Sequence, residues 1–403
     1  MEEKRTFNKI YQCYRTLLSL DVSEYESEKS RLVFPVVPIP ILTELCASVC
    51  RTVMGEPVML KLKGEYIVVG DLHGQILDLF RILRKFGHPP KRNYIFLGDI
   101  VDRGEFSTET VILIFLMKAL WPENIYIIRG NHEFSDLWPS CGFLRELETI
   151  YGEAQVSPIF ANVFAYLPLT AIVNDKYLCV HGGIGPKTPG IEQLEKIQRP
   201  CFSFLSEPVL SIVWSDPSEK VQDFQPSTRG TGYLYGASSL KTYLDSQNLE
   251  LLIRGHECID KGVEFCLNNR CVTVFSASNY CGVAMNQAGV LILKPEVEPE
   301  SVVMNSLRWI KRTSASYLGS SSETSFFLSS KPTKLKSASQ QSFPTLKQNI
   351  SAKNSLLMNN GNSSSPNSPP GRTTPKLAKL AIQQPSSIPA EFLRPRNYSL
   401  KSC

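Results

Sequence analysis

The 403-residue chain contains no run of about 18 apolar residues, the length that a membrane-spanning helix requires. It begins Met-Glu-Glu-Lys-Arg and lacks the apolar segment of a secretory signal peptide. Its eleven cysteines are spread over the chain and form no Cys-x-x-Cys motif, a pattern that favours reduced thiols over disulfides or a Cys-rich zinc site. We therefore expect a protein of the cytosol or the nucleus that does not bind a membrane.

Acidic residues are nearly absent from residues 313–403, where eleven Lys and Arg stand against Glu323 and Glu391 alone. This segment is also rich in Ser and Pro, a composition that buries too little apolar surface to fold. The rest of the chain is mildly acidic, whereas nucleic-acid-binding modules concentrate positive charge on the fold itself. We predict a disordered basic tail over 313–403 and expect no nucleic acid among the partners.

Short apolar segments that end in polar, Gly-containing clusters recur along the chain, at residues 66–69, 94–97, 125–128, 177–180, 251–253 and 272–275. Continuous apolar segments of this length are typical of strands buried on both faces of a sheet. A helical pattern that Gly87 should end follows the first segment, with Asp78 on its exposed side. A second helix, which Ser107 could cap, ends before Pro122. This alternation predicts an α/β layered fold with its functional loops at the strand ends.

Four of the five histidines stand beside Gly at the end of a predicted strand: His73, His132, His181 and His256. One such histidine alone would more often be an ordinary loop residue, but four in parallel settings indicate a metal site. The same loops carry Asp71, Asp99 and Asn131, and such a donor set suits Mn²⁺, Fe or Zn²⁺ in a number sufficient for two ions. Two cations about 3.5 to 4 Å apart can share a hydroxide and neutralise oxygens at phosphorus. Arginines in these loops could hold a phosphate bidentately.

Five motifs follow one another in these loops: Gly-Asp-x-His-Gly at 70–74, Gly-Asp-x-Val-Asp-Arg-Gly at 98–104, Gly-Asn-His-Glu at 130–133, His-Gly-Gly at 181–183 and Ser-Ala-x-Asn-Tyr-Cys-Gly at 276–282. From about Ile39 to Lys294 the chain resembles the phosphoprotein phosphatase family of serine/threonine phosphatases, which contains the type one, type 2A and calcineurin catalytic subunits. The resemblance implies a metallophosphoesterase-like fold, a central β-sandwich flanked by helices. We predict an N-terminal helical extension at 1–38 and a catalytic domain at 39–312.

The resemblance also implies two divalent metal ions, Mn²⁺ in vitro and Fe or Zn²⁺ in the cell. Six side chains would bind them: Asp71 and His73 the first ion, Asn131, His181 and His256 the second, and Asp99 both. Arg103, Arg229 and Asn131 would hold the phosphate, and Tyr280 would line the cleft. His132, oriented by Asp102, would be the general acid. Asp102 could instead cap a turn, Tyr280 could be packing, and Glu133 and Glu257 are equally well explained as scaffold.

The sequence departs from the family at three places. Arg229 stands in Ser-Thr-Arg-Gly where relatives read Asn-Asp-Arg-Gly, so an acidic neighbour that would orient it is missing. Ser278 replaces a Pro, and residues 134–139 differ from the loop of the relatives. These changes lie at the rim of the expected site, where substrates and regulatory subunits would bind.

Three functions fit the motifs. The first is a protein serine/threonine phosphatase in which a hydroxide bridging two metals attacks phosphoserine or phosphothreonine directly, without a phosphoenzyme. The second is a related phosphoesterase for small esters such as dinucleoside polyphosphates, and the third is an inactive relative that binds phosphoproteins. The complete ligand set and the 276–282 loop favour the first. We expect phosphoprotein substrates and regulatory or targeting subunits as partners.

Overall fold

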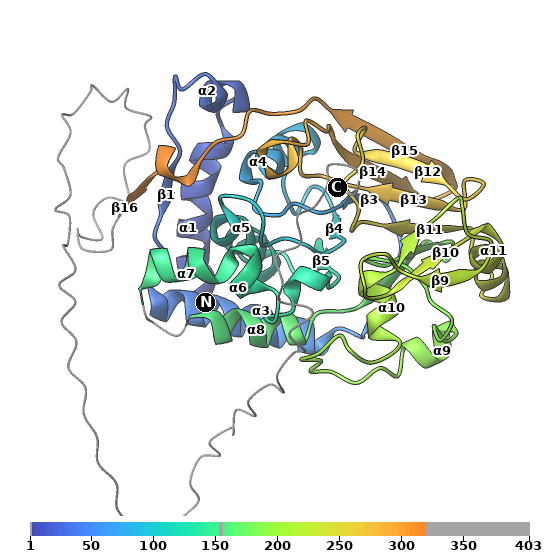
Figure 1. Cartoon of the computed structure of the whole chain (residues 1–403). Helices are drawn as coiled ribbons and strands as arrows, with labels where there is room; N and C mark the ends of the chain where they lie inside the picture. The colour runs from blue at the N-terminus through green and yellow to red at the C-terminus, as the bar shows by residue number, and fades with distance from the viewer. Residues whose placement is uncertain (1, 153–155, 319–403) are drawn as a thin grey trace, which may run out of the picture. The chain divides into compact units, whose positions relative to one another are not determined.

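Two β-sheets form the centre of the computed structural model, which describes residues 2–152 and 156–318 (Figure 1). The first sheet has the order β12 (Val263–Cys266), β13 (Cys271–Val274), β11 (Leu251–Arg254), β7 (Tyr177–Cys179), β6 (Thr170–Val173), β2 (Met59–Leu62). The second has the order β15 (Val297–Met304), β14 (Ala288–Lys294), β3 (Tyr66–Val69), β4 (Tyr94–Phe96), β5 (Ile125–Ile127). The pairs β3–β4, β4–β5, β7–β11 and β11–β13 are parallel.

Alternate side chains of the strands point into different cores, because successive residues of a strand face opposite sides of the sheet. Val68 and Ile95 of one sheet pack with Ile253 and Val272 of the other in a core between the sheets. Their neighbours on the same strands, such as Ile67, belong to an outer core instead. The predicted β-sandwich is therefore confirmed, and all six predicted strands are present within a residue or two of the expected bounds.

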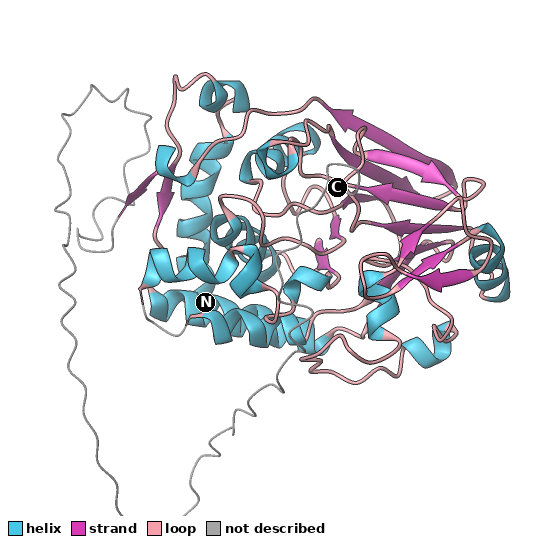
Figure 2. Cartoon of the chain, viewed as in Figure 1, coloured by secondary structure: helices cyan, strands magenta, loops and turns pink. Residues whose placement is uncertain are grey.

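Helices cover the outer faces of both sheets, as Figure 2 shows in cyan. On the five-stranded sheet these are α1 (Glu2–Leu18), α3 (Ile39–Gly55), α4 (Ile76–Phe86), α5 (Ser107–Leu120), α6 (Trp138–Cys141), α7 (Phe143–Tyr151) and α8 (Ser157–Ala165). On the six-stranded sheet they are α9 (Ile191–Leu194), α10 (Val209–Trp214) and α11 (Ala237–Ser246). No helix within residues 2–152 and 156–318 combines the length and apolarity that crossing a bilayer requires.

Two local predictions about the helices were wrong. Asp78 is buried rather than exposed: it accepts hydrogen bonds from the backbone N–H (2.8 Å) and hydroxyl (3.1 Å) of Ser278 and pairs with Arg81. Ser107 does not cap α5; the carboxylate of Glu146 accepts the N–H groups at that end of the helix instead. Both errors arise from partners far away in the sequence. Gly87 does end α4, with a φ of 102°.

Residues 305–318, here called the strap, follow β15 and run back to the N-terminal part of the chain (Figure 1). The strap contains a 3-10 turn, η3 (Arg312–Ser314), and ends in β16 (Ser316–Leu318), which pairs in parallel with β1 (Val33–Pro35). The expected tail boundary at residue 313 falls inside this ordered strap, and residues 319–403 of the predicted tail lie outside the described residues. The N-terminal 38 residues contain α1, α2 (Val22–Glu26) and β1, and α1 packs into the same core as α5.

Candidate metal centre

The predicted site residues meet at one edge of the sandwich, where the parallel strands of both sheets end. Nine of them come from five loops: Asp71 and His73 after β3, Asp99, Asp102 and Arg103 after β4, Asn131 and His132 after β5, His181 after β7, and His256 after β11. An isolated bridge between Asp71 and Phe275 links the two sheets at this edge. The sandwich thus brings together residues as far apart in sequence as Asp71 and His256, whose N–H donates to the Asp71 carboxylate at 2.9 Å.

Asp99 lies between two groups of donors. Its Oδ2 is 3.5 Å from Nε2 of His73, while its Oδ1 is 3.3 Å from Nε2 of His181. On the first side, Oδ2 of Asp71 is 3.8 Å from the same nitrogen of His73. The two oxygens of one carboxylate therefore face different donor groups, a position from which Asp99 could contact two cations.

The second donor group contains His181, His256 and Asn131. Nε2 of His181 lies 2.8 Å from Oδ1 of Asn131 and 3.2 Å from Nδ1 of His256. Two nitrogens that are each about 2.1 Å from one cation lie roughly 3.0 to 3.4 Å apart, so this spacing fits ligands of a single ion. Nε2 of His256 and Nδ2 of Asn131 are buried without a hydrogen-bond partner among the described residues, so each could still bind a further group.

Backbone carbonyls fix the tautomers of two histidines. Nδ1 of His73 is 2.9 Å from the carbonyl oxygen of Val101, and Nδ1 of His181 is 2.9 Å from that of Leu97. Because a carbonyl only accepts, Nδ1 of each ring carries the proton and donates it. Nε2 of each ring is left with a lone pair that faces the acidic cluster, which is the state that a metal ligand requires.

The backbone at this edge is tightly constrained. Five predicted site residues have φ between 42° and 71°, a region that few residues other than Gly adopt and that clusters at functional sites: His73, Asp99, Asp102, Arg103 and His256. Two glycines make room for the carboxylates, since a Cβ on Gly255 or Gly130 would lie 2.3 Å from Oδ1 of Asp71 or Asp99, respectively. The Gly residues of the motifs therefore admit the acidic side chains.

His132 and Asp102 form a buried pair beside the cluster. Nδ1 of His132 lies 2.8 Å from Oδ2 of Asp102, and Oδ1 of Asp102 accepts the N–H of Phe143 at 2.8 Å. Asp102 thus orients His132 and also holds the start of α7. Since Asp102 occupies Nδ1, the remaining ring nitrogen Nε2 is the one that can exchange a proton with a ligand.

Arg229 is held by Asp216 of the short strand β8 (Asp216–Pro217). Nε of Arg229 donates to Oδ2 of Asp216 at 2.6 Å, and Nη2 donates to the carbonyl oxygen of His256 at 3.3 Å. The acid that orients this arginine therefore comes from another element, which compensates for Thr228 in the preceding position. The side chain of Arg229 is 35% exposed, so the guanidinium can be reached from solvent.

Arg103 and Tyr280 lie near each other at the open side of the site. Arg103 is exposed, and its charge lowers the pKa of Tyr280, although burial raises that pKa by more. The ring of Tyr280, in the 3-10 turn η2 (Tyr280–Gly282), is centred 5.2 Å from the ring of His73 and 5.2 Å from that of Phe275. Tyr280 thus both packs on the fold and borders the metal-ligand candidates.

The electrostatics of the cluster favour bound cations. Burial raises the pKa of Asp71 to about 7, with a further contribution from the charge of Asp99, and burial raises the pKa of Asp99 to about 8. Burial also lowers the pKa values of His73 and His256 well below the usual range. Neutral imidazoles beside buried carboxylates leave the cluster short of positive charge. Two divalent cations would supply that charge, and the donor set fits them.

Comparison with known proteins agrees with this geometry. Residues 65–260 match the calcineurin-like phosphoesterase family (Metallophos). These residues form a calcineurin-like phosphoesterase domain. A protein serine/threonine phosphatase from Saccharomyces cerevisiae, described as similar to human phosphatase PP5, is 29% identical over 68% of this chain and 91% of its own, with a TM-score of 0.64. The resemblance to the phosphoprotein phosphatase family is thereby confirmed.

Two other solved structures match at lower identity. A cold-active protein-tyrosine phosphatase from a psychrophilic Shewanella is 15% identical, covering 63% of this chain and 84% of its own, with a TM-score of 0.47. A metallophosphoesterase from Sphaerobacter thermophilus is also 15% identical, covering 60% and 89%, with a TM-score of 0.35.

Three buried side chains of this phosphoesterase domain support the site without being predicted to do so. Glu133, whose role the sequence left open, accepts the N–H groups of Asp99 (2.8 Å), Ile100 (2.9 Å) and Gly130 (2.9 Å) and is scaffold. Asp216 and Arg254 are paired at 2.7 Å, and Arg254 also donates to the carbonyl oxygen of Gly182. Arg254 could have been predicted to support the site, because it lies two residues before the predicted ligand His256.

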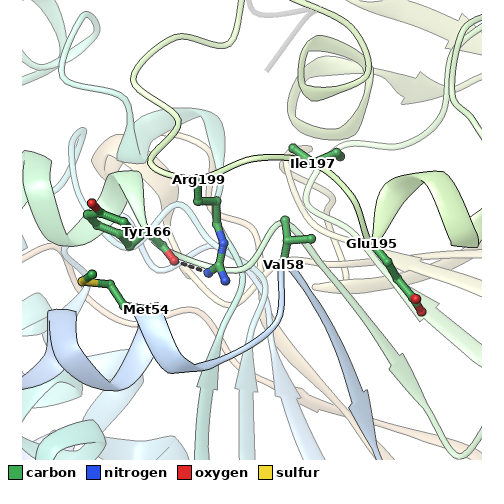
Figure 3. A pocket seen from close by; sticks show the side chains of 6 residues that line it. All are labelled: Met54, Val58, Tyr166, Glu195, Ile197 and Arg199. Atoms are coloured by element: carbon green, nitrogen blue, oxygen red, sulfur yellow. Dashed lines mark hydrogen bonds between the residues drawn. The ribbon is translucent and has the colours of Figure 1, made fainter.

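A cavity of about 430 Å³ lies away from the predicted ligands and contains none of them. It is lined by Met54, Val58, Tyr166, Glu195, Ile197 and Arg199 (Figure 3). The guanidinium of Arg199 donates to the carbonyl oxygens of Val53, Glu56 and Tyr166. Its hydrogen bonds therefore stabilise the surrounding backbone. The cavity offers no free charged group for a phosphate.

Proposed function

We propose that the chain is a protein serine/threonine phosphatase that hydrolyses phosphoserine and phosphothreonine with two divalent metal ions. The observation that carries the proposal is the position of Asp99, whose two oxygens face the His73 and His181 donor groups separately. The yeast serine/threonine phosphatase, at 29% identity over most of its length, supports a protein substrate. The 276–282 loop, which small-ester relatives usually lack, supports it as well.

The chain's own residues have distinct tasks in this proposal. Asp71, His73, Asp99, Asn131, His181 and His256 would hold the two cations. When bound, such ions polarise phosphate oxygens and lower the pKa of water. Arg103 and Arg229 bind the phosphate from the open side, where a guanidinium can contact two oxygens at once.

His132 would transfer a proton from Nε2 to the leaving seryl or threonyl oxygen, while Asp102 retains the proton on Nδ1. Burial and the charge of Arg103 lower the pKa of His132 well below its usual range, which opposes the imidazolium. A phosphate dianion bound next to Arg103 and Arg229 acts in the other direction, because a nearby anion raises the pKa of an imidazole. A bound phosphate thus favours the protonated form of His132 that proton transfer requires.

The substrate class can be tested with purified full-length protein reconstituted with Mn²⁺. We expect kcat/KM to be highest for phosphoserine and phosphothreonine peptides, lower for a phosphotyrosine peptide, and lowest for diadenosine tetraphosphate. His132→Asn is the control for contaminating phosphatases. A preference for the dinucleotide would make the chain a small-ester phosphoesterase, and binding of phosphopeptide without turnover would make it a phosphoprotein-binding relative.

Regulatory or targeting subunits and phosphoprotein substrates form part of the same proposal, and so does a site of action in the cytosol or nucleus. Ser278, expected at the rim, is instead buried against Asp78, so among the departures only exposed residues of the segment 134–139 could meet a partner. A partner that binds there would differ from those of the type one and type 2A phosphatases. Affinity capture from native cells, with the Asp99→Asn variant as bait to retain substrates, would identify such partners.

A further inference from the structure

Cys266 and Cys271 face each other across the hairpin formed by β12 and β13. They are direct partners in the antiparallel register. Directly opposite residues in antiparallel strands have Cα atoms about 4.5 to 5.5 Å apart. A disulfide accommodates Cα separations of about 4.4 to 6.8 Å. The two sulfurs can therefore be joined without moving either strand.

The turn between these strands holds the two cysteines in place. Leu267, Asn268 and Asn269 have φ between 50° and 61°, and the N–H of Arg270 donates to the carbonyl oxygen of Leu267 at 3.1 Å. Asn tolerates this left-handed region better than most residues, so the turn fits its sequence. Because the register of a hairpin is fixed by its turn, the thiols remain opposite each other.

The two thiols differ in access and in acidity. Cys266 is partly exposed, whereas Cys271 has no exposed surface. Burial raises the pKa of Cys271, but the interaction with Cys266 and the charge of Arg254 outweigh it, and the net direction is downward. The pair thus combines a thiol that a small oxidant can reach with a buried partner that has thiolate character, while the interaction with Cys271 and burial raise the pKa of Cys266 itself.

The buried thiol is connected to the candidate metal centre through Tyr235. The hydroxyl of Tyr235 lies 3.7 Å from Sγ of Cys271 and donates to the carbonyl oxygen of Gly182 at 3.4 Å. The ring of Tyr235 packs so closely on Gly183 that a Cβ there would lie 2.1 Å from it. Gly182 and Gly183 directly follow His181. A shift of the Cys271 side chain would therefore reach the segment directly after His181 through Tyr235.

We propose that Cys266 and Cys271 form a reversible redox site that responds to hydrogen peroxide. Peroxide oxidises the thiol of Cys266 to a sulfenic acid, with cleavage of the O–O bond and release of one water. The sulfur of Cys271 then attacks the sulfenic sulfur, forms the disulfide and releases a second water, so the two thiols lose two electrons and two protons in all. Thiol reductants such as glutathione restore the pair.

Formation of the disulfide can be tested independently of any activity. Full-length protein is treated with peroxide, its remaining thiols are alkylated, and peptides are analysed by mass spectrometry. We expect the peptide that contains both cysteines to lose two hydrogens and to escape alkylation, with reversal by dithiothreitol. The proposal is overturned if both thiols stay alkylatable while Cys258 or Cys281 is modified.

The link to the metal centre is tested by activity and rests on the proposed function. We expect oxidised wild-type protein to lose activity and regain it on reduction, whereas Cys266→Ser and Cys266→Ala keep their activity under peroxide. Two variants are used because either alone could disturb the hairpin, and melting temperatures check both. A disulfide that leaves activity unchanged, or an equal loss in the variants, would disprove the coupling through Tyr235. A protein that forms the disulfide but has no phosphatase activity would refute the proposed function alone.

Discussion

Two clusters of buried carboxylates in this molecule differ in how they obtain positive charge. In the strap cluster, Glu109 and Glu146 both contact the guanidinium of Arg312 at 2.6 Å. In the metal-site cluster, the direct ion-pair partners of Asp71 and Asp99 within the described residues are histidines, which burial keeps neutral. The first cluster carries its cation on a side chain, and the second is built to take cations from solution. Burial alone thus does not mark a functional carboxylate; its charge partner does.

The largest expected effect is that of Asp99→Asn. An amide cannot bridge two cations as a carboxylate does, so both ions should bind more weakly and phosphopeptide hydrolysis should be abolished. Metal content by elemental analysis and the steady-state rate check this. The matched control is Asp175→Asn, with a side chain that is 73% exposed in the turn at the opposite end of β7 from His181. Retention of both metals and the rate in the first variant would refute the dinuclear assignment.

His132→Asn should separate proton transfer from metal binding. We expect both cations to remain while kcat for a phosphoserine peptide falls about 10²- to 10⁴-fold, the typical effect of removing a general acid. The loss should be smaller for p-nitrophenyl phosphate, whose leaving group needs little protonation. Equal losses on the two substrates would assign His132 to phosphate binding instead.

Arg312→Met should affect stability rather than catalysis. It leaves Glu109 and Glu146 buried without their cation, which should lower the free energy of unfolding by about 3 to 5 kcal/mol. Arg308→Met is the control in the same strap, since Arg308 pairs with Glu28 at an exposed position. Chemical denaturation of the three proteins measures the difference.

The same variant has a predictable pH dependence. Burial and the charge of Glu109 raise the pKa of Glu146 above its value in an unfolded chain, and the charge of Arg312 opposes this shift, so the pKa should be higher still in Arg312→Met. A carboxyl group with a raised pKa destabilises the fold as pH increases between the two values, because the unfolded chain releases the proton first. The deficit of Arg312→Met should therefore be smaller at pH 5 than at pH 8, and a constant deficit would contradict the charge explanation.

Two truncated proteins should show which residues after Arg312 contribute to stability. Removal of residues 319–403 should leave stability and metal content unchanged. Removal from residue 313 onward should destabilise the protein, because it deletes β16 and the ring of Tyr317, which is centred 6.1 Å from that of Phe34. Melting temperatures of the two truncated proteins test this. Equal stability would mean that the strap contributes nothing after Arg312.

The smallest expected effect concerns His88, the one histidine outside the metal site. Its Nδ1 lies 3.1 Å from the hydroxyl of Tyr11, and burial lowers its pKa to about 4. Since the pKa in the folded state is below that of the unfolded chain, stability should fall as pH decreases from about 6.5 to 4. His88→Gln should weaken that dependence. Denaturation midpoints at pH 7 and pH 5 for both proteins would show it, and parallel curves would contradict it.

The convergence of the residues in the metal-site cluster could be predicted from the sequence because its parts are local. A strand, a Gly-containing turn and a histidine are each readable within five residues, as at His73 and His181. The sandwich then brings these short segments together, since the carboxyl ends of parallel strands meet at one edge. The family resemblance supplied the division of ligands between two ions, which the residues alone left open.

The cluster in the strap was not predictable in the same way. Arg312 pairs with Glu109, which is more than 200 residues away in the sequence. The local sequence around either residue does not predict this contact. Asp78 was misplaced for the same reason, because its partner Ser278 is 200 residues away. Asp216 likewise orients Arg229 through the fold rather than through adjacent sequence. Long-range ion pairs depend on tertiary packing, which periodicity does not encode.

The pairing of β1 with β16 has a consequence for synthesis on the ribosome. Arg31 donates a hydrogen bond to the carbonyl oxygen of Ser314, 283 residues later in the chain. During translation the N-terminal segment emerges long before the strap is synthesised. Until then Arg31 lacks the carbonyl oxygen of Ser314, and Phe34 lacks its contact with the ring of Tyr317. Contacts between distant residues form slowly, and N-terminal segments that wait are exposed to aggregation and chaperones. Nascent chains released before residue 318 should therefore bind chaperones longer than those released after it.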